Sequence, residues 1–222
     1  MSTIVSPARN TEPETLADML ERLGNVPTSR IRFQPLPGTA TEEDVLTIQA
    51  NEDRIYELID GILVEKAMGF AESLLAVYLA RMLHGFVRSR KLGLVVGPDG
   101  MMKLSRGLVR IPDVSFVSWK DIPGGKVPKE PIPKLAPTLA VEVLSESNTP
   151  AEIKRKRREL FKAGTSLMLV IDPRERTAAV WTSVRKPVEL TAADTLDGGD
   201  VLPGFKLALC DLFAELDEKA PG

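Results

Sequence analysis

The sequence predicts a single α/β domain in which a mixed sheet is flanked by helices on both sides. Three observations indicate this class. Asp60-Gly61 separates two apolar runs, which is a strong hairpin signal. Residues 69–91 carry an apolar face at helical spacing, and after them come several short β-branched segments and one more helix. At 222 residues with 43% hydrophobic content, the chain is long enough for one sizeable core.

The first part of the chain divides into an arm, a hairpin and a long helix. We expect residues 1–40 to form an N-terminal arm with one short helix, and residues 41–215 to form the domain. The segment RIYELIDGILVEK predicts two strands that meet at Asp60-Gly61. The apolar positions that follow recur every three or four residues, as one buried helical face requires. They are Leu74, Leu75, Tyr78, Leu79, Met82, Leu83, Phe86 and Val87.

The second part of the chain predicts strands interrupted by one well-marked helix. Central strands are expected in LGLVVG, MMKLSRGLVRIPDVSFVSW and LAPTLAVEVLS, with a Pro/Gly/Lys-rich loop before the last. The helix TPAEIKRKRRELFKAG has Thr149 as its N-cap, Glu152 as the capping-box partner and Gly164 as its stop.

The C-terminal part predicts two more strands and a closing helix. SLMLVIDP and TAAVWTS have the composition of strands. VLPGFKLALCDLF indicates a loop that leads to a short helix, in which we expect Cys210 to be buried.

Composition limits the partners and the compartment. The net charge is -2, so any site for a polyanion must be a local basic patch. The single cysteine cannot form an internal disulfide, and the first residues lack the features of a signal peptide, so the cytoplasm is the expected compartment. No apolar run approaches the roughly 20 residues that span a bilayer, and no membrane association is expected.

Composition also limits the chemistry. Structural zinc sites need about four Cys or His ligands, and this chain has one of each. A histidine-dependent triad would have to use His84, which lies in the predicted long helix with no nucleophile elbow near it. We expect His84 to be a surface or packing residue, so hydrolytic chemistry would rest on carboxylates and lysines.

Two carboxylates lie in predicted strands of apolar residues, where burying their charge costs free energy. Alternation along LAVEVLS places Leu139, Val141 and Val143 on one face and Ala140, Glu142 and Leu144 on the other. Both faces are apolar, so Glu142 needs a cation, a metal ion or hydrogen-bond donors. Asp113 is also flanked by apolar residues in a predicted strand, so its charge needs a similar partner. Two interpretations stay open: pairing with arginines such as Arg110 or water at strand ends, or convergence on one Mg²⁺ ion.

Six segments together resemble a known family. YELIDGILVEK, RIPDVSFV, LAVEVLSESNT, AEIKRKRRELFKAG, LVIDP and VLPGF occur in this order between about residues 40 and 213. In these segments and their order, the chain resembles the Uma family of restriction endonuclease-like proteins, a branch of the PD-(D/E)XK nuclease superfamily. The resemblance implies a restriction-endonuclease-like PD-(D/E)XK core and a metal-dependent endonuclease that hydrolyses DNA, with Mg²⁺ as the cofactor and Mn²⁺ as a substitute.

The resemblance also implies residue roles. Asp113 and Glu142 would bind the metal together with the main-chain carbonyl of Val143, and Glu57 matches an upstream acidic residue of the family. The superfamily pattern places a lysine two positions after the second acid, but this position is Leu144. The resemblance then assigns the lysine to the following helix, at Lys156, where it would orient or activate the attacking water.

The helix that carries Lys156 has a second interpretation. Lys156 lies four residues after Glu152, so the pair could be an ordinary salt bridge on a solvated face. The neighbouring basic residues could contact the DNA backbone or simply face solvent. They are Lys154, Arg155, Arg157 and Arg158.

Three functions remain to be weighed. The first is metal-dependent hydrolysis of DNA, with a homodimer expected by analogy with related nucleases. The second is a catalytically inactive nucleic-acid-binding or scaffolding protein, which the missing lysine at Leu144 would favour. The third is an enzyme acting on small phosphorylated molecules, which would need a closed pocket.

Overall fold

Two β-sheets form the framework of the protein, which we describe from a computed structural model for residues 15–52, 54–66 and 68–220. In spatial order the larger sheet holds β11 (Val188–Thr191), β10 (Thr177–Trp181), β9 (Leu167–Asp172), β8 (Leu139–Val143), β7 (Val114–Ser118) and β4 (Gly93–Val96). The smaller sheet holds β1 (Ile31–Arg32), β3 (Ile62–Glu65), β2 (Tyr56–Ile59), β6 (Leu108–Arg110) and β5 (Met102–Ser105). The larger sheet is mixed, because β8 and β9 pair in parallel and its other neighbours pair antiparallel.

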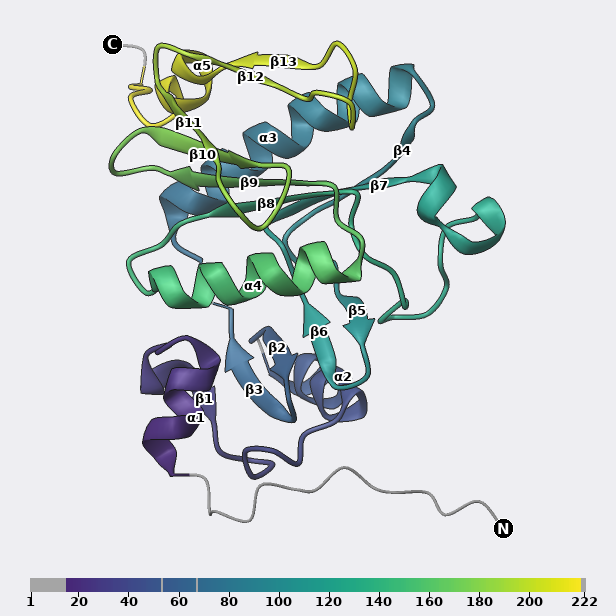
Figure 1. The fold of residues 1–222 in the computed structure, drawn as a ribbon, viewed down its shortest axis with the longest axis vertical. Coiled ribbons are helices and arrows are strands. Elements are labelled where there is room, and N and C mark those ends of the chain that lie inside the picture. The colour runs from purple at the N-terminus through teal and green to yellow at the C-terminus, as the bar shows by residue number, and fades with distance from the viewer. Residues whose placement is uncertain (1–14, 53, 67, 221–222) are drawn as a thin grey trace.

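Helices cover both faces of the larger sheet, so the predicted fold class is confirmed. Figure 1 shows α3 (Phe70–Ser89) and α4 (Pro150–Ala163) on opposite sides of it. The predicted alternation along β8 is also correct. Val141 packs in the core that α3 shares with the sheet, and Ala140 packs in the core on the α4 side with Leu160. Glu142 therefore points toward α4.

The predicted hairpin and long helix are present. β2 and β3 pair antiparallel with Ile59 opposite Ile62, so Asp60 and Gly61 alone form the turn. Their φ angles are 52° and 76°, the left-handed values that this two-residue turn requires. α3 has the length and mean hydropathy of a membrane span, contrary to the sequence expectation. It buries one face against the sheet, through residues such as Leu79 and Leu83, as a core helix does.

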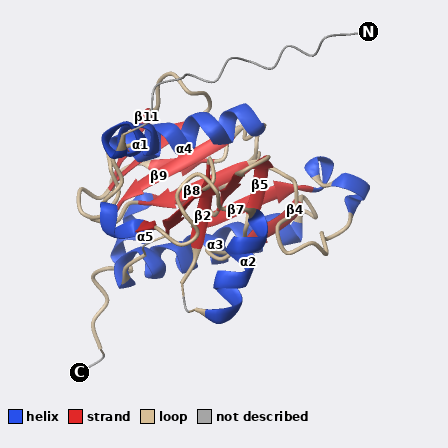
Figure 2. Ribbon diagram, turned by 90° about the horizontal axis from the view of Figure 1, so that it is seen from below, coloured by secondary structure: helices blue, strands red, loops and turns tan. Residues whose placement is uncertain are grey.

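The described part of the expected arm is packed on the domain. α1 (Leu16–Leu23) is followed by a 3-10 turn (Thr28–Arg30), and β1 then pairs with β3. Leu23 and Ile31 are buried in the same cluster as residues of the hairpin. Figure 2 shows α1 beside α4. Residues 1–14, which were also assigned to the arm, lie outside the described residues.

Four elements did not follow from the sequence patterns. They are the second sheet as a separate unit, α2 (Glu42–Asn51), β11, and the small β12–β13 pair (Thr195–Asp197 with Lys206–Ala208). In addition, β4 and β5 are edge strands and not central ones. The segment that follows β7 contains 3-10 turns at Trp119–Asp121 and Pro123–Gly125, where the sequence predicted a strand through Trp119 and a loop from Asp121.

The prediction that Cys210 is buried is wrong. In α5 (Leu209–Ala214) the buried residues are Leu209, Leu212 and Phe213, at the spacing of one helical face. Cys210 lies off this face and is exposed.

Candidate active site

A small polar cavity lies where β7, β8 and α4 approach the smaller sheet, and it contains both strand carboxylates. Asp113 directly precedes β7, and Glu142 is on the neighbouring β8, where Val141 pairs with Val114. Asp113 and Glu142 are 5% and 6% exposed. The cavity holds about 20 Å³ of space, enough for roughly one water molecule or one small ion. Strand pairing therefore brings the two predicted acids to one place.

Glu142 combines an ion pair with an unsatisfied oxygen. Its Oε2 lies 2.7 Å from Nζ of Lys156. Its Oε1 is buried and has no hydrogen-bond partner among the described residues. Burial raises the pKa of the Glu142 carboxyl to about 7; the nearby Lys156 opposes this, and repulsion from Asp113 and Glu57 adds to it. Glu142 is the group in this cavity with an open coordination position.

Asp113 is held by both of its oxygens. Oδ2 accepts a hydrogen bond of 2.6 Å from the main-chain N–H of Val143. Oδ1 lies 2.9 Å from Nζ of Lys66, which also donates to the carbonyl of Pro98 at 2.9 Å. The bond to Val143 fixes Asp113 against the strand that carries Glu142.

Glu57 anchors the cations of the site. Its Oε1 accepts from the Ile111 N–H at 2.8 Å and lies 2.9 Å from Lys156, and its Oε2 lies 2.5 Å from Arg110. Burial alone would raise the pKa of the Glu57 carboxyl, but Lys156 and Arg110 outweigh burial and hold this pKa well below its usual range. Since both oxygens are occupied, Glu57 positions Lys156.

Lys156 reaches the site from the second turn of α4. The side chain is 5% exposed and bridges Glu57 and Glu142. Burial alone would lower the pKa of the Lys156 ammonium, but Glu142 and Glu57 outweigh burial and raise it. The alternative of a solvated pair with Glu152 is wrong, because Glu152 caps α4 and forms two bonds of 3.0 and 2.8 Å with Arg30.

Comparisons with known proteins show the family and the fold of the chain. The family model of Uma2, described as "Putative restriction endonuclease", matches residues 42–210. The chain belongs to the Uma2 family. A solved structure described as a putative nuclease belonging to DUF820, from Anabaena variabilis ATCC 29413, is similar at 20% sequence identity and a TM-score of 0.67. The match covers 74% of this chain and 93% of that chain, and shows a shared restriction-endonuclease-like fold. A search of curated proteins finds no significant match.

The basic residues of α4 in this Uma2 protein divide into two groups. Lys154 and Arg158 are exposed and available to a partner. Arg155 pairs with Asp60 and Glu159, at 2.7 Å each. Arg157 is 9% exposed and lies over the ring of Trp181. Arg155 and Arg157 therefore contribute to packing, and the exposed basic face of the helix is narrower than the sequence implied.

Several site residues of the Uma2 chain were not predicted from the sequence as site members, among them Lys66, Arg30 and the main-chain donor Ile111. Lys66 had a signal. Glu57 is opposite Val64 in the hairpin, and strand alternation puts Lys66 on the same face as Val64. Arg30 lacked a signal, because it lies 122 residues before Glu152 in the chain.

The donor set of the cavity fits a hard divalent cation. Two carboxylates, one with a buried oxygen that lacks a partner, lie beside Val143 in a cavity of ionic size. Within the described residues no three Asp, Glu, His or Cys side chains form a metal-binding group. Asp113, Glu142 and the Val143 carbonyl would therefore share the cation with water, as Mg²⁺ prefers. Lys66 and Lys156 balance the two carboxylates without an ion.

Proposed function

We propose that this Uma2 protein is a Mg²⁺-dependent endonuclease that hydrolyses DNA phosphodiester bonds. The observation that carries the proposal is the convergence of Asp113, Glu142 and Lys156 on one cavity. Lys156 brings its ammonium to the acid pair from α4, although Leu144 occupies the position where the superfamily places its lysine. The proposed site thus has the two acids and one lysine of the superfamily pattern, but the lysine comes from a helix and not from the strand that carries Glu142.

Each side chain has a separate task in this proposal. A divalent cation held by Asp113, Glu142 and the Val143 carbonyl would stabilise negative charge that develops on the phosphate. Lys156 stays protonated, so it donates hydrogen bonds that orient the attacking water and does not accept its proton. Glu57 and Arg110 fix the position of Lys156 from the smaller sheet.

Two other functions fit the site less well. An enzyme for small phosphorylated molecules needs a pocket of about 300–1,000 Å³, far more than the 20 Å³ of this cavity. A binding protein without catalysis is favoured by one observation, the pairing of Lys66 with Asp113, which occupies an oxygen that the metal would use. A cleavage assay separates this candidate from the nuclease.

We expect purified protein to nick supercoiled plasmid in Mg²⁺ or Mn²⁺ and not in EDTA. Asp113→Asn removes one anionic ligand and should lower the nicking rate by about a hundredfold or more. Asp99→Asn changes the same residue type at an exposed position and should cut like wild type. Equal nicking by Asp113→Asn and wild type would exclude the proposed metal ligand.

Metal affinity should depend on pH through Glu142. Because burial raises the pKa of this carboxyl to about 7, a proton occupies it in the metal-free protein below that pH. Metal binding must then displace the proton, so the apparent Mn²⁺ affinity should fall roughly tenfold per pH unit below 7 and level off above 8. Calorimetry at pH 6 in buffers of different ionisation enthalpy should detect release of about one proton. A flat affinity between pH 6 and 8 would contradict this role.

A further inference from the structure

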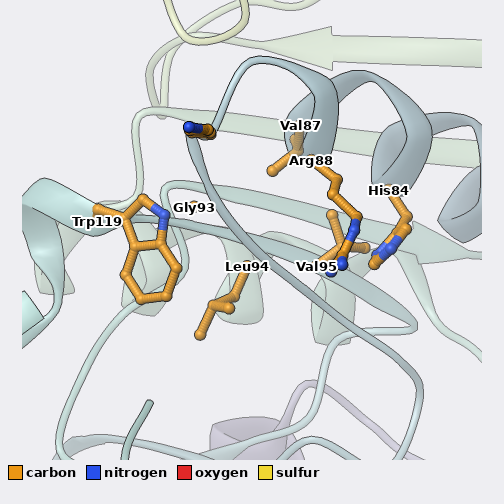
Figure 3. Close-up of a pocket in the computed structure, with 8 residues that line it drawn as sticks. His84, Val87, Arg88, Gly93, Leu94, Val95 and Trp119 are labelled. Atoms are coloured by element: carbon orange, nitrogen blue, oxygen red, sulfur yellow. The ribbon is translucent and has the colours of Figure 1, made fainter. Parts of the chain in front are cut away.

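A shallow pocket lies at the opposite end of the larger sheet from the candidate active site. It has a volume of about 550 Å³ and is lined by the C-terminal half of α3, the edge strand β4 and Trp119. Figure 3 shows His84 and Arg88 projecting from α3 on one side of β4 and Trp119 on the other side. Trp119 follows Asp113 by six residues along β7, a separation on the order of 20 Å. The pocket is therefore distinct from the catalytic cavity.

The pocket is cationic without compensation. His84, Arg88 and Lys91 line it and are exposed. No side-chain hydrogen bond or ion pair is formed by these three residues within the described part of the chain. The chain has no acidic residue between Glu72 and Asp99. In a protein of net charge -2, such a local excess of positive charge favours an anionic partner.

The main chain adds donors to this pocket. The N–H of Trp119 donates to the carbonyl of Leu92 at 3.1 Å, while that of Ser118, which is opposite Gly93, donates to Oγ1 of Thr138. In antiparallel pairing the hydrogen-bonded positions alternate. Gly93 and Val95 therefore point their main-chain groups away from β7, across the open edge of the sheet.

The side chain of Trp119 favours an anion that also carries a planar ring. Trp119 is partly exposed at the rim and can stack on a planar ring. The pocket volume lies in the range of sites that hold one small molecule. A second copy of the chain is disfavoured at this edge, since it would bring Arg88 and Lys91 close to their own equivalents. Cations beside an indole suit a nucleotide, with its phosphate and its base.

We infer that this pocket binds an unpaired nucleotide of the DNA substrate, with phosphates on Arg88 and Lys91 and the base against Trp119. The inference rests on the proposed function for DNA as the source of the nucleotide. It implies a preference for single-stranded or frayed DNA, because a base inside a duplex cannot stack on a side chain.

The test measures binding in EDTA, so that no cleavage is needed. Oligo-dT of twelve nucleotides should quench tryptophan emission, and Trp119→Leu should remove the quenching while Trp181 remains as a second fluorophore in the same chain. Arg88→Glu with Lys91→Glu should weaken binding at least tenfold and reduce the salt slope by about 1.4, the value for two single-strand phosphates. Arg185→Glu with Lys186→Glu, exposed in the loop between β10 and β11, is the matched control and should change affinity less. Thermal unfolding checks that each variant is folded.

The outcomes separate this inference from the proposed function. Unchanged quenching in Trp119→Leu, or an equal loss of affinity in the Arg185/Lys186 control, would overturn the inference even if plasmid nicking is normal. Quenching by oligo-dT that depends on Trp119 would support it even if no nicking occurs. If dTMP binds as tightly as oligo-dT, the ligand of the pocket would be a free nucleotide and not a DNA strand. Binding of an acidic peptide with alternating Glu and Val, but not of oligo-dT, would reassign the edge to a peptide strand.

Discussion

Lys156→Met should reduce plasmid nicking by about 10² to 10⁴-fold, the range expected when a positioned proton-donating or water-orienting group is lost. The methionine keeps most of the side-chain volume but leaves Glu57 and Glu142 facing each other without the ammonium between them. Binding of Mn²⁺ should persist, because Asp113 and Glu142 are retained. Single-turnover nicking, normalised to the folded fraction measured by circular dichroism, reports this loss.

Two further variants make the Lys156 prediction specific. Lys162→Met removes the same charge from an exposed position near the end of the same helix and should nick like wild type. Lys156→Arg keeps the charge but not the geometry, and should recover only part of the rate. A Lys156→Met protein that is folded and nicks at the wild-type rate would remove Lys156 from the mechanism.

Arg110→Met should cause the largest loss of stability, about 3–5 kcal/mol, because it removes a buried cation that two carboxylates share and leaves the buried Glu57 with Lys156 but without Arg110. Arg110 is 1% exposed and joins Glu57 of the smaller sheet to Glu159 of α4, with contacts of 2.5 Å to each. Urea unfolding followed by circular dichroism measures the difference. Arg54→Met is the control: it loses a contact to Glu65 but is 58% exposed, and should cost less than about 1 kcal/mol.

The stability loss in Arg110→Met should shrink as the pH falls. The pKa of Glu57 is held below its usual range in the folded protein, so its ionised form stabilises the fold above the unfolded pKa and this contribution is lost toward acid. In the variant Glu57 protonates more easily, so the difference from wild type should be smaller near pH 4 than at pH 7. A difference that is small at pH 7, or that grows toward acid, would contradict the linking role of Arg110.

Local patterns predicted the parts of the fold that depend on neighbouring residues. Asp60-Gly61 specified its hairpin turn, and Thr149 with Glu152 specified the start of α4, because these signals act within a few residues. Alternation along β8 placed Glu142 on the same face as Ala140, and the structure shows that this face is turned toward α4. The position of Lys156 near Glu142 came from the resemblance to the Uma family and did not follow from helical spacing alone.

The rest of the site depends on contacts between distant segments. Arg30 meets Glu152 only because α1 and β1 pack beside the start of α4, and the sequence of residues 15–40 looked like a separate arm. Arg110 was considered as a partner for the strand acids, yet its partners are Glu57 and Glu159, on two other elements. The sequence also overestimated how many basic residues of α4 face solvent, for the same reason. Arg155 contacts Asp60 of the hairpin turn, and Arg157 contacts Trp181 of β10, which are both distant in the chain.

Asp113 and Glu142 should together form a metal site, and calorimetric titration of Mn²⁺ at pH 8 measures this directly. We compare wild type with Asp113→Asn combined with Glu142→Gln, two substitutions that keep the shape of both side chains and remove their charge. We expect one ion to bind per wild-type chain and no measurable binding by the double variant. Equal binding by both proteins, or none by the wild type, would exclude a metal site at these carboxylates and favour a protein that keeps the nuclease fold without its metal chemistry.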